Sequence, residues 1–281
     1  MRNKYIKILG IQPKVNLDCD EKNEYLIEDS IFYKQVTKLK ELISKKNPDI
    51  VVIPEMCYVE ELDDYYLKIS KNKLIIAGSI YKNGFNYTVV FSNKSKYLVK
   101  KYNASGAEPM VRYQDSTSTE DFIKYYLNEH IFTINNRKIL VLNCLEYYCH
   151  AYTIARKYND IFAIICICSN SNQKVFIEES KAIHNHSENI YSFVVNCISN
   201  YQNEEYAKGN TYIFGPIQYH EQDWLKKEGF ELENHSCSIL KLSNKPEYFY
   251  GEFTNNFSRF GRSDNYQNNP KNIEIGNLME E

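Results

Sequence analysis

The sequence predicts an α/β protein in which two β-sheets lie back to back and helices cover their outer faces, a four-layer α-β-β-α sandwich. Strand patterns at 73–81, 86–93 and 96–102 follow one another with only turn residues between them, which favours strands paired within one sheet. Strand and helix patterns alternate over 138–199, which favours helices packed outside a sheet. A chain of 281 residues is long enough to bury the large core that this arrangement requires.

The first half of the chain contains two further strand patterns and two helix patterns. Strand-forming residues at 5–12 are followed by apolar residues at helical spacing over 28–46, and an Asn-Pro pair ends that helix. The apolar run at 49–55 has the composition of a strand buried on both faces. A short helix is expected at 61–70, before the three consecutive strands.

The second half of the chain continues the alternation of strands and helices. Residues 103–129 have no regular pattern at first and then a helical one. The elements expected after them are strands at 132–134 and 138–144, a helix at 150–158, a strand at 160–169, a helix at 174–191, and strands at 192–199, 209–216 and 235–242.

One domain is predicted over 1–250, because no change of composition within it marks a linker. Residues 251–281 are rich in Asn, Ser and Arg and have little core pattern. We therefore expect an extended C-terminal tail that is disordered or docked on a partner subunit.

Composition and charge argue against several classes of protein. The net charge of −2 provides no strongly basic surface for nucleic acid and no polybasic segment for a membrane. No apolar stretch reaches the length of a bilayer span, and the N-terminus lacks an apolar signal segment. Most of the eight cysteines lie in apolar runs, which is typical of reduced thiols in a cytoplasmic protein rather than of disulfides.

A metal site is a possible role for the cysteines near the middle of the chain, but their spacing argues against it. Structural zinc sites usually contain paired C-x2-C motifs, whereas the spacings here are C-x4-C-H and C-x-C in apolar surroundings. Two histidines two residues apart on a helix face different ways, so a second candidate pair is also weak. The residues concerned are Cys144, Cys149, His150, Cys166 and Cys168, and the pair His184 and His186.

Three strand ends carry residues that could act together in catalysis. Glu55 ends an apolar strand, where a carboxylate is unfavourable unless it lies at the mouth of a site. Lys101 ends a second strand, and Cys144 ends a third, where a thiol can project beside backbone N–H groups. Each residue also has a structural interpretation, as an acid at a helix N-terminus, a charge on an edge strand and a packed core thiol, respectively.

The order of these three residues resembles the Glu-Lys-Cys triad of the carbon-nitrogen hydrolase (nitrilase) superfamily. The likeness extends from the first strand to about Pro216, and it rests on motifs that are weak singly but occur in the family's order. "IKILGIQ", "DIVVIPEMC", "KKYNASGAEP" and "RKILVLNCLEYY" resemble the first strand, the Pro-Glu motif, the segment with a lysine and a downstream glutamate, and the Cys-x-Glu motif. The resemblance implies the four-layer α-β-β-α sandwich of that superfamily.

The resemblance also implies a role for each matching residue. The catalytic residues would be Glu55 as the base, Lys101 as the cation, Cys144 as the nucleophile and Glu108 as the residue that orients Lys101 or the attacking water. The substrate-binding residues would be Leu145, through its backbone N–H, the adjacent acid Glu146, and the aromatic residues Tyr102 and Tyr147.

The sequence departs from the family pattern around the expected pocket. The interval between Glu55 and Lys101 is shorter than the family pattern leads us to expect, and "YYCHAY" replaces the Pro-Glu that usually follows the acid after the nucleophile. The strand after the nucleophile ends in Cys168-Ser169 instead of Pro-Ser. Lys100 is a second candidate for the lysine, although the spacing to Glu108 favours Lys101.

The family chemistry implies a cysteine-dependent hydrolase of non-peptide carbon-nitrogen bonds that needs neither a metal nor an organic cofactor. A thioester would form on Cys144, and the expected partners are a small amide, a carbamoyl compound or a nitrile. Family members commonly form dimers through helices near the nucleophile, so a homodimer is expected. The alternative function is a catalytically silent module of this fold that binds a ligand or serves as a scaffold in a multicomponent bacterial system such as defence.

Overall fold

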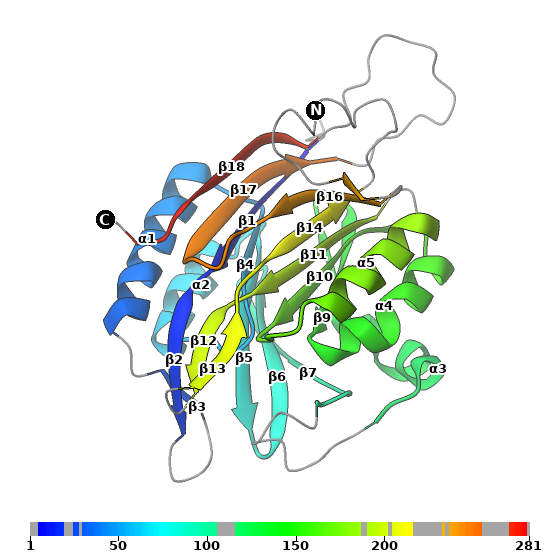
Figure 1. Cartoon of the computed structure of the whole chain (residues 1–281), viewed down its shortest axis with the longest axis horizontal. Coiled ribbons are helices and arrows are strands. Elements are labelled where there is room, and N and C mark those ends of the chain that lie inside the picture. The colour runs from blue at the N-terminus through cyan, green and yellow to red at the C-terminus, as the bar shows by residue number, and fades with distance from the viewer. Residues whose placement is uncertain are drawn as a thin grey trace.

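The fold contains two large β-sheets that pack face to face (Figure 1). The computed structural model describes residues 5–19, 25–27, 30–105, 116–186, 190–201, 204–215, 232–233, 236–254 and 270–279. The first sheet has the spatial order β18 (Lys271–Asn277), β17 (Glu247–Phe253), β1 (Ile6–Gln12), β4 (Ile50–Ile53), β5 (Leu74–Lys82), β6 (Phe85–Ser92) and β7 (Ser95–Lys100). The second has the order β15 (Leu232–Glu233), β16 (Ser236–Lys241), β14 (Tyr212–Gly215), β11 (Tyr191–Asn196), β10 (Ile161–Cys168), β9 (Arg137–Asn143) and β8 (Ile131–Ile134).

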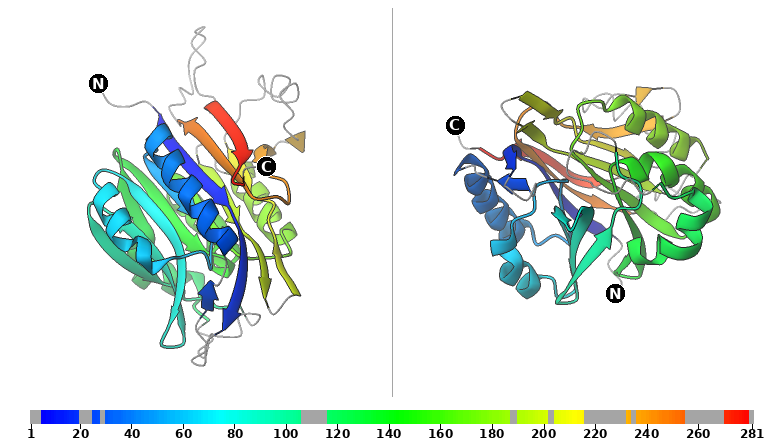
Figure 2. Two further views of the ribbon diagram at one scale, coloured as in Figure 1. Left: turned by 90° about the vertical axis from the view of Figure 1, so that its left-hand side faces the viewer. Right: turned by 90° about the horizontal axis from the view of Figure 1, so that it is seen from below.

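Helices cover the outer face of each large sheet, as the two views of Figure 2 show. α1 (Ser30–Lys46) and α2 (Asp63–Ile69) pack on the first sheet, and α4 (Leu145–Lys157) and α5 (Lys174–His186) pack on the second. Short helical segments connect other elements: η1 (Glu60–Leu62), α3 (Thr119–Asp121), η2 (Phe122–Tyr126) and η3 (Leu127–His130). The predicted four-layer α-β-β-α sandwich is confirmed.

The alternation of side chains along the strands explains why three separate apolar cores form. In β4, Val52 faces the core between the sheets, whereas Val51 and Ile53 face the core under α1 and α2. Every residue of β4 and of β10 is buried, because each of these central strands has one face in each of two cores. The sequence of each strand is therefore a continuous apolar run instead of an alternating one.

A smaller sheet extends from one end of the sandwich. It has the order β13 (Glu204–Lys208), β12 (Ile198–Tyr201), β2 (Lys14–Cys19) and β3 (Tyr25–Ile27), and β12 pairs with β2 in parallel. β2 follows β1 of the first large sheet, and β12 follows β11 of the second. The small sheet therefore joins extensions of both large sheets on one side of the molecule.

The C-terminal part of the chain corrects the predicted division into a domain over 1–250 and a tail over 251–281. β17 crosses residue 250 and pairs with β1 along its whole length, and β18 pairs with β17 as the last strand of the sheet. The strand pattern of β18 is easy to miss in the sequence, because the strand lies at the edge of the sheet and its side chains are exposed or half-buried. Residues 251–254 and 270–279 thus belong to the first sheet, while 255–269 lie outside the described residues.

Among the helices that the structure describes, none is long and apolar enough to span a membrane.

Candidate functional site

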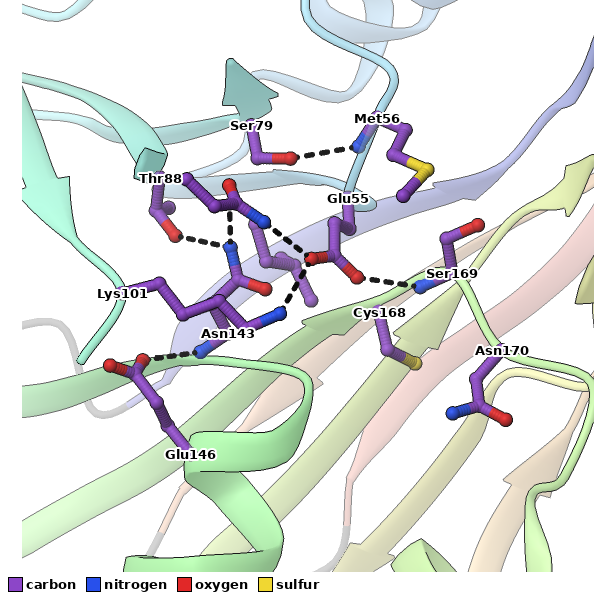
Figure 3. A network of polar contacts seen from close by, with 12 residues as sticks. Glu55, Met56, Ser79, Thr88, Lys101, Asn143, Glu146, Cys168, Ser169 and Asn170 are labelled. Carbon is purple, nitrogen blue, oxygen red and sulfur yellow. Dashed lines mark hydrogen bonds and ion pairs between the residues drawn. The ribbon is translucent and has the colours of Figure 1, made fainter. Parts of the chain in front are cut away.

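Residues from both large sheets meet where their central strands end. Glu55 follows β4, and Lys101 follows β7, both in the first sheet, while Cys144 and Ser169 follow β9 and β10 of the second. Figure 3 shows the Glu55 carboxylate between Lys101 on one side and Ser169 on the other. The site is therefore assembled from four segments that are distant in sequence.

The Glu55 carboxylate is buried and accepts hydrogen bonds from three different groups. Lys101 Nζ lies 3.0 Å from Oε1, and Asn86 Nδ2 donates to the same oxygen at 2.9 Å. The backbone N–H of Ser169 donates to Oε2 at 3.0 Å. Glu55 is 1% exposed and Lys101 is 3% exposed, so the two charges form an ion pair largely removed from solvent. Such a pair is stable only when its remaining polar atoms are hydrogen-bonded, and both oxygens of Glu55 have additional donors here.

The backbone on either side of Glu55 packs closely against Gly78 and Ser79 of β5. Gly78 has φ +99°, and a Cβ added there would lie 2.8 Å from the Tyr58 nitrogen and 2.9 Å from the Pro54 oxygen, so a larger residue does not fit. Ser79 Oγ accepts the N–H of Met56 at 3.0 Å. Met56 itself has φ +63°, so the chain turns sharply directly after Glu55. These contacts fix the direction of the carboxylate.

The structure brings Lys101 to Glu55 and directs Lys100 elsewhere. The Lys101 N–H donates to the Asn86 carbonyl oxygen at 2.9 Å, which extends the strand pairing by one residue and turns the Lys101 side chain toward Glu55. The Lys100 ammonium lies 3.9 Å from the centroid of the Phe85 ring, on the opposite side of the strand. Strand alternation therefore separates the two candidate lysines.

Cys144 occupies a sharp turn between β9 and α4. It has φ 47° and ψ −107°, a conformation that few residues other than glycine adopt, and its N–H donates to the Ile167 carbonyl oxygen at 2.8 Å. Ile167 lies two positions before Ser169, which holds Glu55. The turns that present Cys144 and Glu55 are thus both anchored on the end of β10.

Glu146 connects the two turns that present Cys144 and Lys101. It is fully buried, and its two oxygens accept the N–H of Tyr102 at 2.6 Å and the N–H of Asn143 at 3.1 Å. One residue next to Lys101 and one residue next to Cys144 are therefore held by a single carboxylate. Glu146 thus ties the two segments together, and its predicted contact with substrate stays a prediction.

The other residues expected to bind substrate lie in different surroundings. Tyr147 is buried between α4 and α5, with its hydroxyl 2.7 Å from Ser180 Oγ, and burial raises its pKa. Tyr102 stacks on Tyr126 with a centroid separation of 3.8 Å and donates its hydroxyl to Glu129. Among the described residues, neither ring belongs to the hydrogen-bond network around Glu55, and their contact with substrate stays a prediction.

Leu145 and Glu108 complete the set of expected site residues. Leu145 is the first residue of α4, and the first N–H groups of a helix have no acceptor within the helix. This position suits the expected backbone donor beside Cys144. Glu108 lies outside the described residues, and its predicted role stays a prediction.

His150, one of the candidate metal ligands, has other partners. Nε2 of His150 lies 2.9 Å from Asn103 Oδ1, and Nδ1 lies 3.0 Å from Thr119 Oγ1. The ring also stacks on Phe122 at a centroid separation of 4.3 Å. Within the part of the chain that the structure describes, no group of three or more His, Cys, Asp or Glu side chains could hold a metal ion.

The buried histidine beside this stack predicts a dependence of stability on pH. His130 is 1% exposed, and burial lowers its pKa from 6.5 to about 4, so it is neutral in the fold near neutral pH. As pH falls from about 6.5 to 4, the unfolded chain binds a proton that the folded chain does not, which lowers the free energy of unfolding by up to about 3 kcal/mol. Urea unfolding at several pH values in this range measures the effect.

A His130→Gln variant is the control for the pH dependence. Glutamine keeps an amide donor for the Val141 carbonyl oxygen, which His130 Nδ1 contacts at 3.0 Å, but it does not titrate. Its stability should decline less steeply over the same pH range. Parallel declines in the two proteins would show that His130 is not the group responsible.

Sequence reasoning missed three residues of the network around Glu55. Asn86 donates to the carboxylate, Ser169 supplies a backbone donor, and the Asn143 amide contacts Thr88 Oγ1 at 3.2 Å. Asn86 and Thr88 alternate with apolar residues on β6, yet both are buried. Polar residues in the buried register of a strand were the available signal, because such groups need partners.

Comparisons with solved structures find the same fold in proteins of very different sequence. A carbon-nitrogen hydrolase from Helicobacter pylori G27 is 12% identical, with a TM-score of 0.57 over 90% of each chain. A Saccharomyces cerevisiae member of branch 10 of the nitrilase superfamily is 14% identical, with a TM-score of 0.56 over 89% of this chain and 90% of that one. A variant of the amidase from Nesterenkonia sp. AN1, in complex with butyramide, is 9% identical, with a TM-score of 0.58 over 90% of this chain and 92% of that one. No protein-family model and no curated protein matches the sequence.

Proposed function

We propose that this chain, which has the fold of the carbon-nitrogen hydrolase superfamily, is a cysteine-dependent hydrolase of non-peptide carbon-nitrogen bonds. The observation that carries the proposal is the buried ion pair between Glu55 and Lys101, 3.0 Å apart, anchored on the same strand end as Cys144. A buried acid and a buried cation beside a strained cysteine are the groups that thioester chemistry requires. The structurally similar amidase from Nesterenkonia sp. AN1, a variant of which forms a complex with butyramide, supports an amide as the substrate class.

Acylation begins with proton transfer from the Cys144 thiol to Glu55, since the thiolate is the nucleophile. The Cys144 sulfur attacks the carbonyl carbon of the amide, and negative charge develops on the carbonyl oxygen. The Lys101 ammonium and the Leu145 N–H at the start of α4 stabilise that oxygen. Glu55 then gives its proton to the leaving nitrogen, the C–N bond breaks, and the acyl group remains on Cys144 as a thioester.

Deacylation reverses the roles of the same groups. Glu55, again unprotonated, takes a proton from water, and the resulting hydroxide attacks the thioester carbon. The C–S bond breaks, the carboxylic acid is released, and the thiol proton is restored. Glu146 acts through geometry alone, because its two oxygens hold the N–H groups next to Lys101 and Cys144. Glu108 is proposed to orient Lys101 or the attacking water.

The expected substrates are small amides, carbamoyl compounds or nitriles, and the expected assembly is a homodimer. α4 and α5 lie on an outer face of the sandwich, and Tyr148 and Val175 on these helices are 51% and 37% exposed. Exposed apolar side chains on two neighbouring helices suit contact with a second copy.

Site-resolved alkylation tests the proposed function directly. Native protein is treated with limiting iodoacetamide, and the modified cysteines are located by peptide mass spectrometry in the unsubstituted protein and in Glu55→Gln. We expect Cys144 to react first, and we expect the Glu55→Gln substitution to change its rate at least about tenfold, because the thiol loses its base. The unsubstituted protein should also hydrolyse butyramide.

Cys149 is an internal control in the same experiment. It is half-buried, whereas Cys144 is only 6% exposed, so accessibility alone favours Cys149. Burial also raises the pKa of Cys149, and Glu146 and Glu179 contribute to that rise. Because the raised pKa slows Cys149 while its exposure favours it, activation of Cys144 is reported by a fast rate at Cys144 that changes in Glu55→Gln while the rate at Cys149 does not. An inert Cys144, or one with the same rate in Glu55→Gln, would contradict the hydrolase and support the silent binding module.

A further inference from the structure

One buried acceptor at the site has no hydrogen-bond partner within the described part of the chain. Asn143 is 1% exposed, and its Oδ1 is unsatisfied among the residues that the structure describes. Nearly all buried polar atoms in folded proteins have a partner, so an exception beside a candidate nucleophile needs an explanation. Asn143 immediately precedes Cys144, and its N–H is already held by Glu146.

The hydrogen-bond network determines which end of the Asn143 amide is the unpaired one. Glu55, paired with Lys101, can only accept, so Asn86 must direct its Nδ2 toward Glu55, at 2.9 Å. Asn86 consequently directs its Oδ1 toward Asn143, which donates to it at 3.5 Å and to Thr88 Oγ1 at 3.2 Å. Both donor contacts use Nδ2 of Asn143, and Oδ1 is left as an acceptor.

The position of Asn143 places this acceptor among the groups of the proposed reaction. Val141, two residues earlier on β9, faces the core between the two sheets, so Asn143 faces the same space. Figure 3 shows the Asn143 amide between Thr88 and Lys101, on the side of Glu55. The acceptor therefore lies beside the acid that would protonate a leaving nitrogen.

We propose that Asn143 Oδ1 accepts a hydrogen bond from the N–H of the substrate amide and thereby selects amides and carbamoyl compounds over nitriles and esters. This inference rests on the proposed function. An amide nitrogen presents a hydrogen to an acceptor, whereas a nitrile nitrogen and an ester oxygen present only lone pairs. A substrate without an N–H leaves Oδ1 buried and unpaired, which disfavours its transition state relative to that of the amide.

A purely structural role for Asn143 makes a different prediction. In that case the residue would only hold Asn86, and through it Glu55, and its loss would slow every substrate by the same factor. Thr88→Val separates the two roles, because it removes an acceptor for Asn143 Nδ2 and leaves Oδ1 in place. We expect Thr88→Val to change the rates for amide and ester substrates in parallel.

The experiment measures kcat/KM for butyramide and for p-nitrophenyl butyrate, which have the same acyl group. Asn143→Leu is expected to lower kcat/KM for butyramide about 10- to 100-fold and to change that for the ester less than about threefold. Asn143→Ser, with a smaller side chain, should give the same change in the ratio of the two rates if Asn143→Leu folds poorly. An unchanged amide-to-ester ratio in both variants would overturn the inference, and would mean that Oδ1 binds a water molecule or only supports the network.

Cys144→Ala distinguishes this failure from a failure of the proposed function. If Cys144→Ala is inactive on both compounds while the Asn143 variants keep the ratio of the unsubstituted protein, the hydrolase stands and only the selectivity is wrong. If the unsubstituted protein is no faster than Cys144→Ala on either compound, the proposed function and the inference both fail.

Discussion

Replacing Cys144 by alanine should lower kcat for butyramide at least about 10³-fold, because no thioester can form without the thiol. The remaining groups, the Glu55–Lys101 pair and the Leu145 N–H, would still bind the substrate. KM should therefore change far less than kcat. Steady-state kinetics on purified protein, with ammonia release as the readout, measures both parameters.

Cys149→Ala is the matched control for this substitution. Cys144 directly precedes α4, and Cys149 lies in the helix, about one turn further along. Cys149 has no place in the proposed mechanism. Cys149→Ala should retain the activity of the unsubstituted protein, and both variants should keep the same unfolding midpoint within a few degrees. Undiminished hydrolysis by Cys144→Ala would assign the reaction to another group.

Replacing Lys101 by methionine should both abolish activity and destabilise the fold. Methionine replaces the aliphatic part of the lysine side chain but removes the ammonium, so the buried Glu55 carboxylate is left without its cation. Removing one partner of a buried ion pair typically lowers the free energy of unfolding by about 3–5 kcal/mol. Urea unfolding at neutral pH and the butyramide assay measure the two effects separately.

A double variant, Glu55→Gln with Lys101→Met, shows whether the destabilisation comes from the unpaired charge. A neutral amide oxygen at position 55 can still accept from Asn86 and from the Ser169 N–H. Much of the lost stability should therefore return, while the activity should not. Equal stability of Lys101→Met and the unsubstituted protein would contradict a buried ion pair at this site.

The layered fold could be predicted because its signals are local. The buried runs of β4 and β10 and the helical periodicity of α1 each require only a short window of sequence. α4 was expected to begin at residue 150 but begins at Leu145, since Cys144 is a poor N-cap residue and gives no start signal. β18 was missed because its pairing with β17 is set by tertiary contacts, and its own composition is polar.

The site was only partly predictable, for a related physical reason. Glu55, Lys101 and Cys144 could be singled out because a polar or reactive residue at the end of an apolar strand is conspicuous in one segment. Asn86, Asn143 and the Ser169 N–H act only through partners that lie far away in the chain. The surroundings of Tyr147 could not be predicted either, because a residue close to Cys144 in sequence lies on the face of the helix turn that points toward α5.

The position of β1 between β4 and β17 has a consequence for how the protein folds during synthesis. β17 follows every strand of the second sheet in the sequence, so it leaves the ribosome long after β1, β4 and β5. One edge of the apolar strand β1 ("IKILGIQ") therefore remains unpaired until β17 has been translated. Long-range pairing of this kind is slow, and a nascent chain interrupted before β17 exposes a strand edge that favours aggregation.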